Sequence, residues 1–176
     1  MKNGSLFRKL TGYLLCFIIG SLVGWLYEVI LGLIVTGEWS DRGILYLPLC
    51  PIYGFGVLLI LAALGEKRKR KPLYIFLYGF VLSTVLELTA SYLIEWTLHM
   101  RLWSYEQWPL HFEWRISLPS SIIFGLFSLL VIGLIYPLIE KFVSKMPLFL
   151  GILLDIMLLA AVITDSVFSI LIWYNI

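Results

Sequence analysis

The sequence predicts an all-α fold, a polytopic membrane bundle of five transmembrane helices. Three observations support it: the composition, the length of the apolar runs and the distribution of basic side chains. Of the 176 residues, 61% are hydrophobic and 14% are charged, whereas soluble domains carry about 45–50% apolar and about 25% charged residues. A soluble domain of this size could not bury so much apolar surface, and the composition also excludes disordered, coiled-coil and collagen-like chains.

Five apolar runs are each long enough to cross a hydrocarbon core of about 30 Å, which requires about 20 helical residues. They lie at residues 10–35, 44–64, 73–98, 118–139 and 148–174. Because the connections between them are short, we expect residues 1–176 to form a single integral membrane domain in contact with the lipid bilayer.

The basic residues predict the orientation of these helices. Ten of the 13 fall on one side of the predicted membrane, and only Arg42, Arg101 and Arg115 fall on the other. Positive charge is retained in the cytoplasm, so we expect a cytoplasmic N-terminus and an outside C-terminus. The basic run at residues 67–71 fits this topology signal, and we expect no nucleic-acid partner.

The first four helices show a weak parallel repeat, to which the fifth helix is added. In each half, a glycine precedes a glutamate by eight residues, and a proline in the next helix precedes a glycine by six. These residues are Gly20, Glu28, Pro48 and Gly54 in the first half, and Gly79, Glu87, Pro119 and Gly125 in the second. Repeats of this kind occur in transporters.

Several polar residues stand at membrane depth, where charged side chains are costly and usually face the interior of a helix bundle. We expect an outward-facing pocket in which arginine holds an anionic group and the glutamates hold a cation or a proton. The candidate substrate-binding residues are Glu28, Arg42, Tyr53, Glu87, Glu95, Trp103, Tyr105 and Arg115. The alternative is structural, with the glutamates pairing with Arg42, Arg101 and Arg115 only to lock the helices.

Two further segments have two interpretations each. Residues 48–56 contain two prolines and two glycines, so they form either an irregular wall of a cavity or an ordinary helix start. Residues 99–117 are rich in aromatic side chains, and they form either a lid over the bundle or an aromatic belt at the membrane surface.

No motif indicates catalysis or a bound cofactor. The sequence has no phosphate-binding loop, no zinc-ligand spacing around His99 and His111, and no nucleophile motif of a hydrolase. We therefore expect no cofactor, no metal and, on balance, no enzyme.

Several segments together resemble the CmpB-like family of small bacterial membrane proteins, which is named for type IV ABC-transporter permeases. They are Gly24-Trp25-Leu26-Tyr27-Glu28, Asp41-Arg42-Gly43, Pro48-Leu49-Cys50-Pro51-Ile52-Tyr53-Gly54-Phe55-Gly56, Leu86-Glu87, Glu95, Trp103-Ser104-Tyr105 and Arg115-Ile116. The chain departs from the family where Asp41 replaces an asparagine and Ser104 an aspartate. The resemblance implies a multi-pass protein of the bacterial plasma membrane that serves as a transport component.

These observations predict a transport component that binds or translocates a small polar or amphiphilic solute. Two alternatives remain: an intramembrane enzyme acting on lipid or cell-wall precursors, and a non-catalytic assembly or partner protein. The predicted inner loops contain no obvious docking helix, so an ATP-driven protein would need separate ATPase subunits. A homodimer could pack through the face of Gly20 and Gly24.

Overall fold

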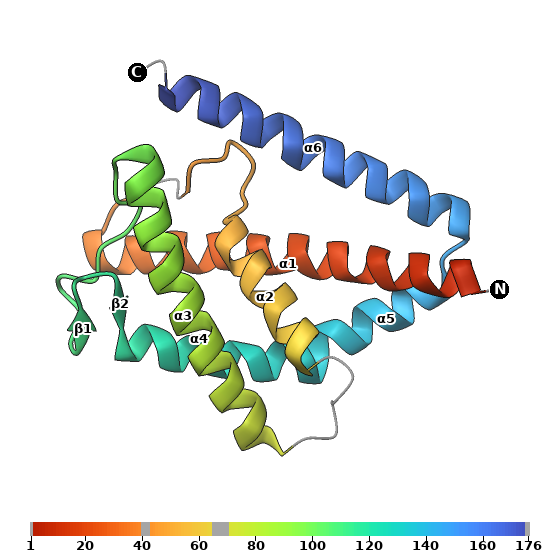
Figure 1. The fold of residues 1–176 in the computed structure, drawn as a ribbon, viewed down its shortest axis with the longest axis horizontal. Helices are drawn as coiled ribbons and strands as arrows, with labels where there is room; N and C mark the ends of the chain where they lie inside the picture. Colours follow the sequence, from red (N-terminus) through yellow and green to blue (C-terminus); the bar gives the residue numbers. More distant parts are fainter. Residues whose placement is uncertain (1, 40–42, 65–70, 175–176) are drawn as a thin grey trace. The chain divides into compact units, whose positions relative to one another are not determined.

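The computed structural model describes residues 2–39, 43–64 and 71–174, which are mostly helical (Figure 1). The elements are α1 (Lys2–Thr36), α2 (Pro51–Leu64), α3 (Pro72–Leu98), β1 (His111–Phe112), β2 (Ile116–Ser117), α4 (Leu118–Leu130), the π-helical turn η2 (Val131–Ile135), α5 (Tyr136–Lys145) and α6 (Leu148–Tyr174). Four helical stretches of this part of the chain are long and apolar enough to cross a membrane: Leu6–Ile34, Pro72–Leu98, Leu118–Lys145 and Leu148–Ile172. The prediction of an all-α membrane protein is therefore confirmed.

The second predicted helix is shorter than expected. α2 has 14 residues and is about 21 Å long, less than a hydrocarbon core of about 30 Å. Residues 44–50, which we expected to be helical, are not. Pro48 and Pro51 explain the difference, because a proline disfavours helical backbone at the residue before it. An extended segment and a short helix therefore replace one continuous helix.

The fourth predicted helix is longer than expected. α4, η2 and α5 follow one another directly to Lys145, although the apolar run ends at residue 139. Pro137 accounts for the π-helical turn, since proline lacks an N–H and crowds the preceding turn. The N–H of Tyr136 donates to the carbonyl of Val131, five residues earlier, and the helix then continues. The predicted connection at 140–147 is thus mostly helical.

The predicted loop at 99–117 contains a small hairpin that the sequence did not reveal. β1 and β2 are antiparallel, with His111 opposite Ser117 and Phe112 opposite Ile116. Residues 113–115 form the turn, in which Glu113 and Trp114 have positive φ values of 48° and 60°. Strands of two residues are too short to show the alternation by which a strand is predicted.

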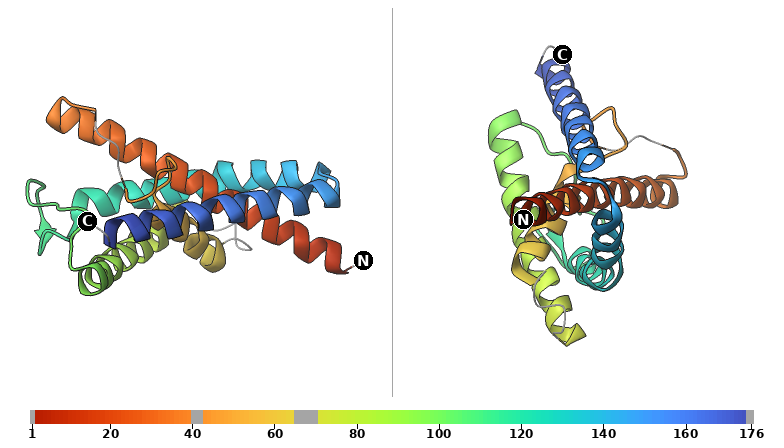
Figure 2. Two further views of the ribbon diagram at one scale, coloured as in Figure 1. Left: turned by 90° about the horizontal axis from the view of Figure 1, so that it is seen from above. Right: turned by 90° about the vertical axis from the view of Figure 1, so that its right-hand side faces the viewer.

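The chain forms two compact units. The first comprises Met1–Gly54 and Leu138–Ile176, and the second comprises Phe55–Pro137. In the first unit α1 packs against α6, and in the second α3 packs against α4 (Figures 1 and 2).

One helix contact occurs in both units and agrees with the predicted repeat. A Cβ atom added to Gly54 would lie 2.6 Å from the ring of Phe17, and one added to Gly125 would lie 2.6 Å from the ring of Phe76. Glycine is therefore needed at both places so that the ring can lie against the neighbouring backbone.

The two contacts stand at equivalent positions of the repeat. Phe17 precedes Glu28 by 11 residues, and Phe76 precedes Glu87 by 11 residues. Six buried positions of the second helix and the residues just before it also keep one register. They are Leu49, Cys50, Gly54, Val57, Ile60 and Leu61 in the first half, and Ser120, Ser121, Gly125, Ser128, Val131 and Ile132 in the second. The two halves therefore share this contact and these six buried positions.

Candidate functional site

A polar stripe runs along α3 where it faces α4. Gly79, Ser83, Glu87 and Ser91 are all buried, and residues four apart lie on one helix face. Glu95 continues the stripe at its end, with 37% of its side chain exposed. α4 contributes three buried serines of its own, Ser120, Ser121 and Ser128. Small and hydroxylated residues allow membrane helices to approach closely and to hydrogen-bond with each other.

The deeper part of this interface is built around Glu87, which is 5% exposed. Its carboxylate accepts a hydrogen bond from the Tyr105 hydroxyl, and the same hydroxyl lies 2.8 Å from the Ser120 hydroxyl. Three residues before Glu87, Thr84 donates to the Ser121 hydroxyl at 2.8 Å. We call Glu87, Tyr105 and Ser120 the Glu87 chain.

The hairpin places Tyr105 within this interface. The N–H of Tyr105 donates to the carbonyl of Trp114 at 2.7 Å, and its ring meets Trp108 edge-on at 5.5 Å. Ser117, the last residue of β2, caps α4 by accepting from the N–H of Ser120. The loop and the start of α4 are therefore held together where the tyrosine enters.

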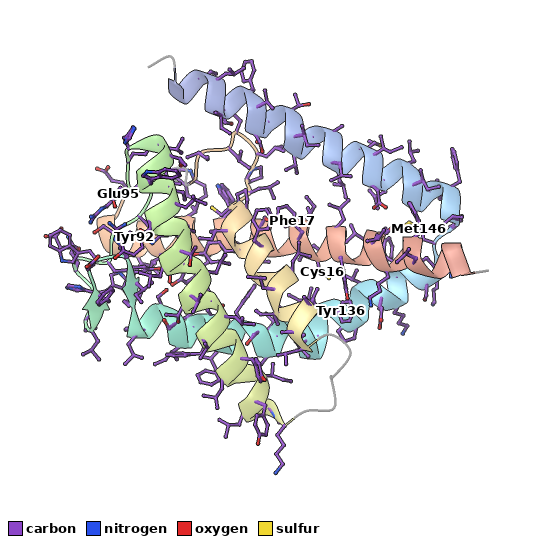
Figure 3. The ribbon with its side chains drawn as sticks, in the orientation of Figure 1. Cys16, Phe17, Tyr92, Glu95, Tyr136 and Met146 are labelled. Atoms are coloured by element: carbon purple, nitrogen blue, oxygen red, sulfur yellow. The ribbon has the colours of Figure 1, made fainter. Side chains whose placement is uncertain are left out.

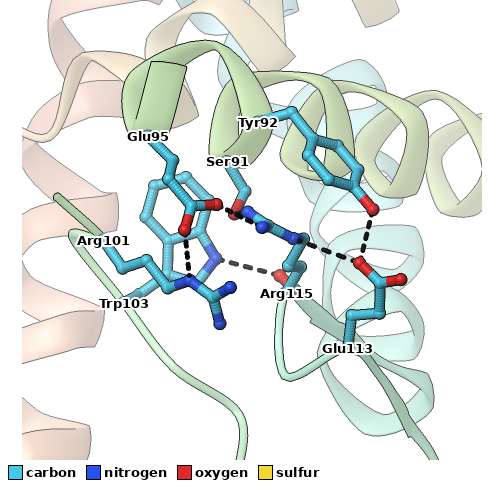
Figure 4. Close-up of polar contacts among 7 residues, drawn as sticks. All are labelled: Ser91, Tyr92, Glu95, Arg101, Trp103, Glu113 and Arg115. Carbon is cyan, nitrogen blue, oxygen red and sulfur yellow. Dashed lines mark hydrogen bonds and ion pairs between the residues drawn. The ribbon is translucent and has the colours of Figure 1, made fainter. Parts of the chain in front are cut away.

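At the C-terminal end of α3, the interface surrounds Arg115, whose side chain is 6% exposed. Its guanidinium donates to the Ser91 hydroxyl at 2.9 Å, pairs with Glu95, and lies 3.5 Å from Glu113 and 4.0 Å from the ring centre of Tyr92 (Figure 4). The Tyr92 hydroxyl in turn donates to Glu113. Figure 3 shows Tyr92 and Glu95 at the end of α3, beside the hairpin.

Two more residues complete this cluster. The Nε of Arg101 lies 3.1 Å from a carboxylate oxygen of Glu95, and the indole N–H of Trp103 donates to the carbonyl of Arg115 at 3.0 Å. We call the cluster the Arg115 network, and its members are Ser91, Tyr92, Glu95, Arg101, Trp103, Glu113 and Arg115. Two guanidinium groups balance two carboxylates within it. The hydrogen bond that Arg115 donates to Glu95 raises the pKa of Arg115 above its already high ordinary value, so Arg115 remains a cation at physiological pH.

Glu28 and Tyr53 form a second, smaller site in the first unit. The Tyr53 hydroxyl donates to the Glu28 carboxylate at 2.5 Å. Gly24 lies one turn before Glu28 and faces the Tyr53 ring so closely that a Cβ atom would overlap it. The glycine therefore lets the ring lie flat against α1, and the ring brings its hydroxyl to the glutamate.

The extended segment before α2 is held by the same unit. The N–H of Cys50 donates to the carbonyl of Ser21 at 3.0 Å, and Ser21 stands near the middle of the span Leu6–Ile34. Asp165 of α6 accepts from the N–H groups of Tyr46 and Leu47 at 3.1 and 2.9 Å. Irregular backbone at membrane depth needs such partners. α2 begins at Pro51, as the prediction of an ordinary helix start expects, and the wall of a cavity stays a prediction.

The eight predicted site residues thus fall into separate groups. Glu95, Trp103 and Arg115 meet in the Arg115 network, and Glu87 and Tyr105 in the Glu87 chain. Glu28 and Tyr53 meet in the first unit, and Arg42 lies outside the described residues. Pairing of Glu95 with both Arg101 and Arg115 is also the arrangement expected from the structural alternative.

Four contributing residues were absent from the prediction: Ser91, Tyr92, Glu113 and Ser120. Ser91 carried a usable signal, since it stands midway between Glu87 and Glu95 on the same face of α3. Glu113 carried none, because its position depends on the unpredicted hairpin.

Comparison with known proteins gives one result. A family model described as "Putative ABC-transporter type IV" (CmpB) matches residues 15–170. No curated protein and no solved structure matches the chain significantly.

Proposed function

The chain belongs to the CmpB family of ABC-transporter-type membrane proteins, and we propose that it is a transport component of the bacterial plasma membrane. In this proposal it binds a small polar or amphiphilic solute from the outer face. Arg115 and Glu95 are the groups that contact the solute first.

One observation carries the proposal: a buried cation is neutralised by partly exposed anions. The Arg115 side chain is 6% exposed, whereas Glu95 and Glu113 are 37% and 53% exposed. A carboxylate or phosphate group of a solute likewise offers the guanidinium a pair of negatively charged oxygen acceptors. Such a group can replace Glu95 or Glu113 and still neutralise the positive charge of Arg115.

The groups around Arg115 suit a solute that carries a cationic group or an apolar surface in addition to its anionic group. Displacement of Glu95 from Arg115 would leave its carboxylate beside Arg101, or available for a cationic group of the solute. Tyr92 and Trp114 are 44% and 45% exposed and offer apolar ring surface close to the charged groups. A zwitterionic or amphiphilic solute would use both.

The test compares the small molecules retained by three forms of the protein, each extracted together with native lipid and analysed by mass spectrometry. These are the wild type, Arg115→Lys and the matched control Arg8→Lys. Lysine keeps the charge of Arg115 but loses the planar fork that binds two oxygens. Arg8 is an exposed residue of α1. We expect a solute retained by the wild type and the control and reduced by about tenfold or more in Arg115→Lys.

Two results would contradict solute binding at Arg115. One is an equal content of small molecules in a folded Arg115→Lys protein and its control. The other is a wild type from which no small molecule is released. If Arg115→Lys instead lost association with another membrane protein while its solute content was unchanged, the assembly alternative would be favoured.

A further inference from the structure

We propose that Glu87 is a proton-binding site and that Tyr105 and Ser120 form a hydrogen-bond chain that reverses when the proton binds. The inference deepens the proposed function, since its physiological use as a proton-coupling site rests on transport by this protein. Proton binding itself can be tested without any solute.

The first argument is a contrast between two glutamates on one helix face. Glu95 is paired with the guanidinium groups of Arg115 and Arg101, which donate hydrogen bonds and cannot accept them. These partners suit a carboxylate only. Glu87 accepts a hydrogen bond from the hydroxyl of Tyr105, and a hydroxyl can both donate and accept. The same contact therefore suits either form of Glu87.

The second argument is that the chain continues beyond Tyr105. The Tyr105 and Ser120 hydroxyls lie 2.8 Å apart, and either can be the donor. When Glu87 is ionised, Tyr105 donates to Glu87 and Ser120 can donate to Tyr105. When Glu87 is protonated, its new O–H donates to Tyr105, and Tyr105 turns its hydrogen toward Ser120.

The change is balanced, because one proton from water joins one carboxylate. Tyr105 and Ser120 each keep their own hydrogen and change only its direction. No bond other than the O–H bond of Glu87 is made or broken, and no other reactant is required.

The third argument concerns the charged groups around Glu87. Of the elements packed against α3 in this unit, α4 from Leu118 to Leu130 and β2 contain no ionisable residue. Tyr105 and Arg115 enter from the loop and the hairpin. Arg115 is directed to Ser91, Glu95 and Glu113. A charged carboxylate is costly to move at membrane depth, so taking up a proton would let α3 move relative to α4 at a lower cost.

The experiment is pH-difference infrared spectroscopy of the protein in lipid bilayers. A protonated carboxyl group has a carbonyl stretching band separate from that of a carboxylate, and we expect such a band to appear as the pH falls. The band should be lost in Glu87→Gln and kept in the matched control Glu106→Gln, which alters an exposed loop residue. In Tyr105→Phe the band should shift in frequency, since the carboxyl group loses its hydroxyl partner.

A pH-difference spectrum of folded Glu87→Gln identical to that of the wild type would overturn the proposal. Should Glu87→Gln fail to fold, Tyr105→Phe decides, because an unshifted set of carboxyl bands would exclude the Glu87 chain. Loss of the solute in Arg115→Lys with the Glu87 band intact supports both proposals. A Glu87 band in a protein that binds no solute would leave proton binding standing and remove the transport role.

Discussion

In the first half of the repeat, Glu28 of α1 accepts a hydrogen bond from Tyr53, which lies in the first turn of α2. In the second half, Glu87 of α3 accepts one from Tyr105, which belongs to the loop between α3 and α4. Both halves nevertheless pack a phenylalanine ring against a glycine at equivalent positions. One contact of the repeat is thus shared, and the polar groups around each glutamate differ.

The difference shows which part of the molecule determines each feature. Glycine–phenylalanine packing depends on residues within the helices, so it is repeated when the sequence pattern is repeated. The environment of each glutamate depends on the segments between helices. The second half of the repeat has a long loop that adds Tyr105 and Arg115, whereas the extended segment of the first half is held by Asp165 of α6.

The largest expected effect tests the shared contact. Gly54→Ala and Gly125→Ala should each destabilise the protein by about 1–3 kcal/mol, because the added methyl group overlaps a phenylalanine ring. The measurement is the midpoint of thermal unfolding in detergent. Gly12→Ala is the matched control, since Gly12 has no atom within 4 Å of the added Cβ, and it should be neutral or slightly stabilising. A large loss of stability at only one of the two glycines would show that the two equivalent contacts do not contribute equally to the stability of the protein.

The next effect tests the difference between the two tyrosines. Tyr105→Phe should cost about 1–3 kcal/mol, because the buried Glu87 chain loses its central hydroxyl. Tyr53→Phe should cost about 0.5–1.5 kcal/mol, since Glu28 and Tyr53 are both partly exposed. The measurement is the unfolding midpoint of each variant, determined under the same conditions. A lower midpoint for Tyr53→Phe than for Tyr105→Phe would contradict this comparison.

A smaller effect is expected at the extended segment. Asp165→Asn keeps one oxygen acceptor of two, so one of the N–H groups of Tyr46 and Leu47 loses its partner, at a cost of about 1 kcal/mol. Amide hydrogen exchange should accelerate at these two residues and remain unchanged across α3 and α4. Acceleration throughout the chain would instead indicate that Asp165 supports the whole protein.

The smallest effect is expected at the rim of the Arg115 network. Arg101→Gln removes a pair in which each side chain is 37% exposed, and exposed pairs contribute little to stability. We expect an unfolding midpoint within experimental error of the wild type, in both low and high salt. A large, salt-dependent fall would show that Glu95 depends on Arg101 as well as on Arg115.

The sequence predicted features that depend on residues close together in one helix. The buried position of Glu87 follows from its place at membrane depth, and the glycine positions follow from the repeat. Features that depend on distant segments could not be predicted. The extended segment before α2 is held by bonds to Ser21 and Asp165, and the environment of Arg115 is fixed by a β-hairpin whose strands have only two residues each. Apolar composition cannot distinguish a continuous helix from an interrupted one when both are equally hydrophobic.

The late position of Asp165 in the chain has a consequence for biogenesis. Tyr46 and Leu47 leave the ribosome more than a hundred residues before the side chain that accepts their N–H groups. Until α6 has been synthesised, these amides require water or an insertion chaperone, because unsatisfied N–H groups are costly in lipid. We therefore expect the second crossing to enter the bilayer after its neighbours, and translation intermediates that stop before α6 to be targets for membrane quality-control proteases.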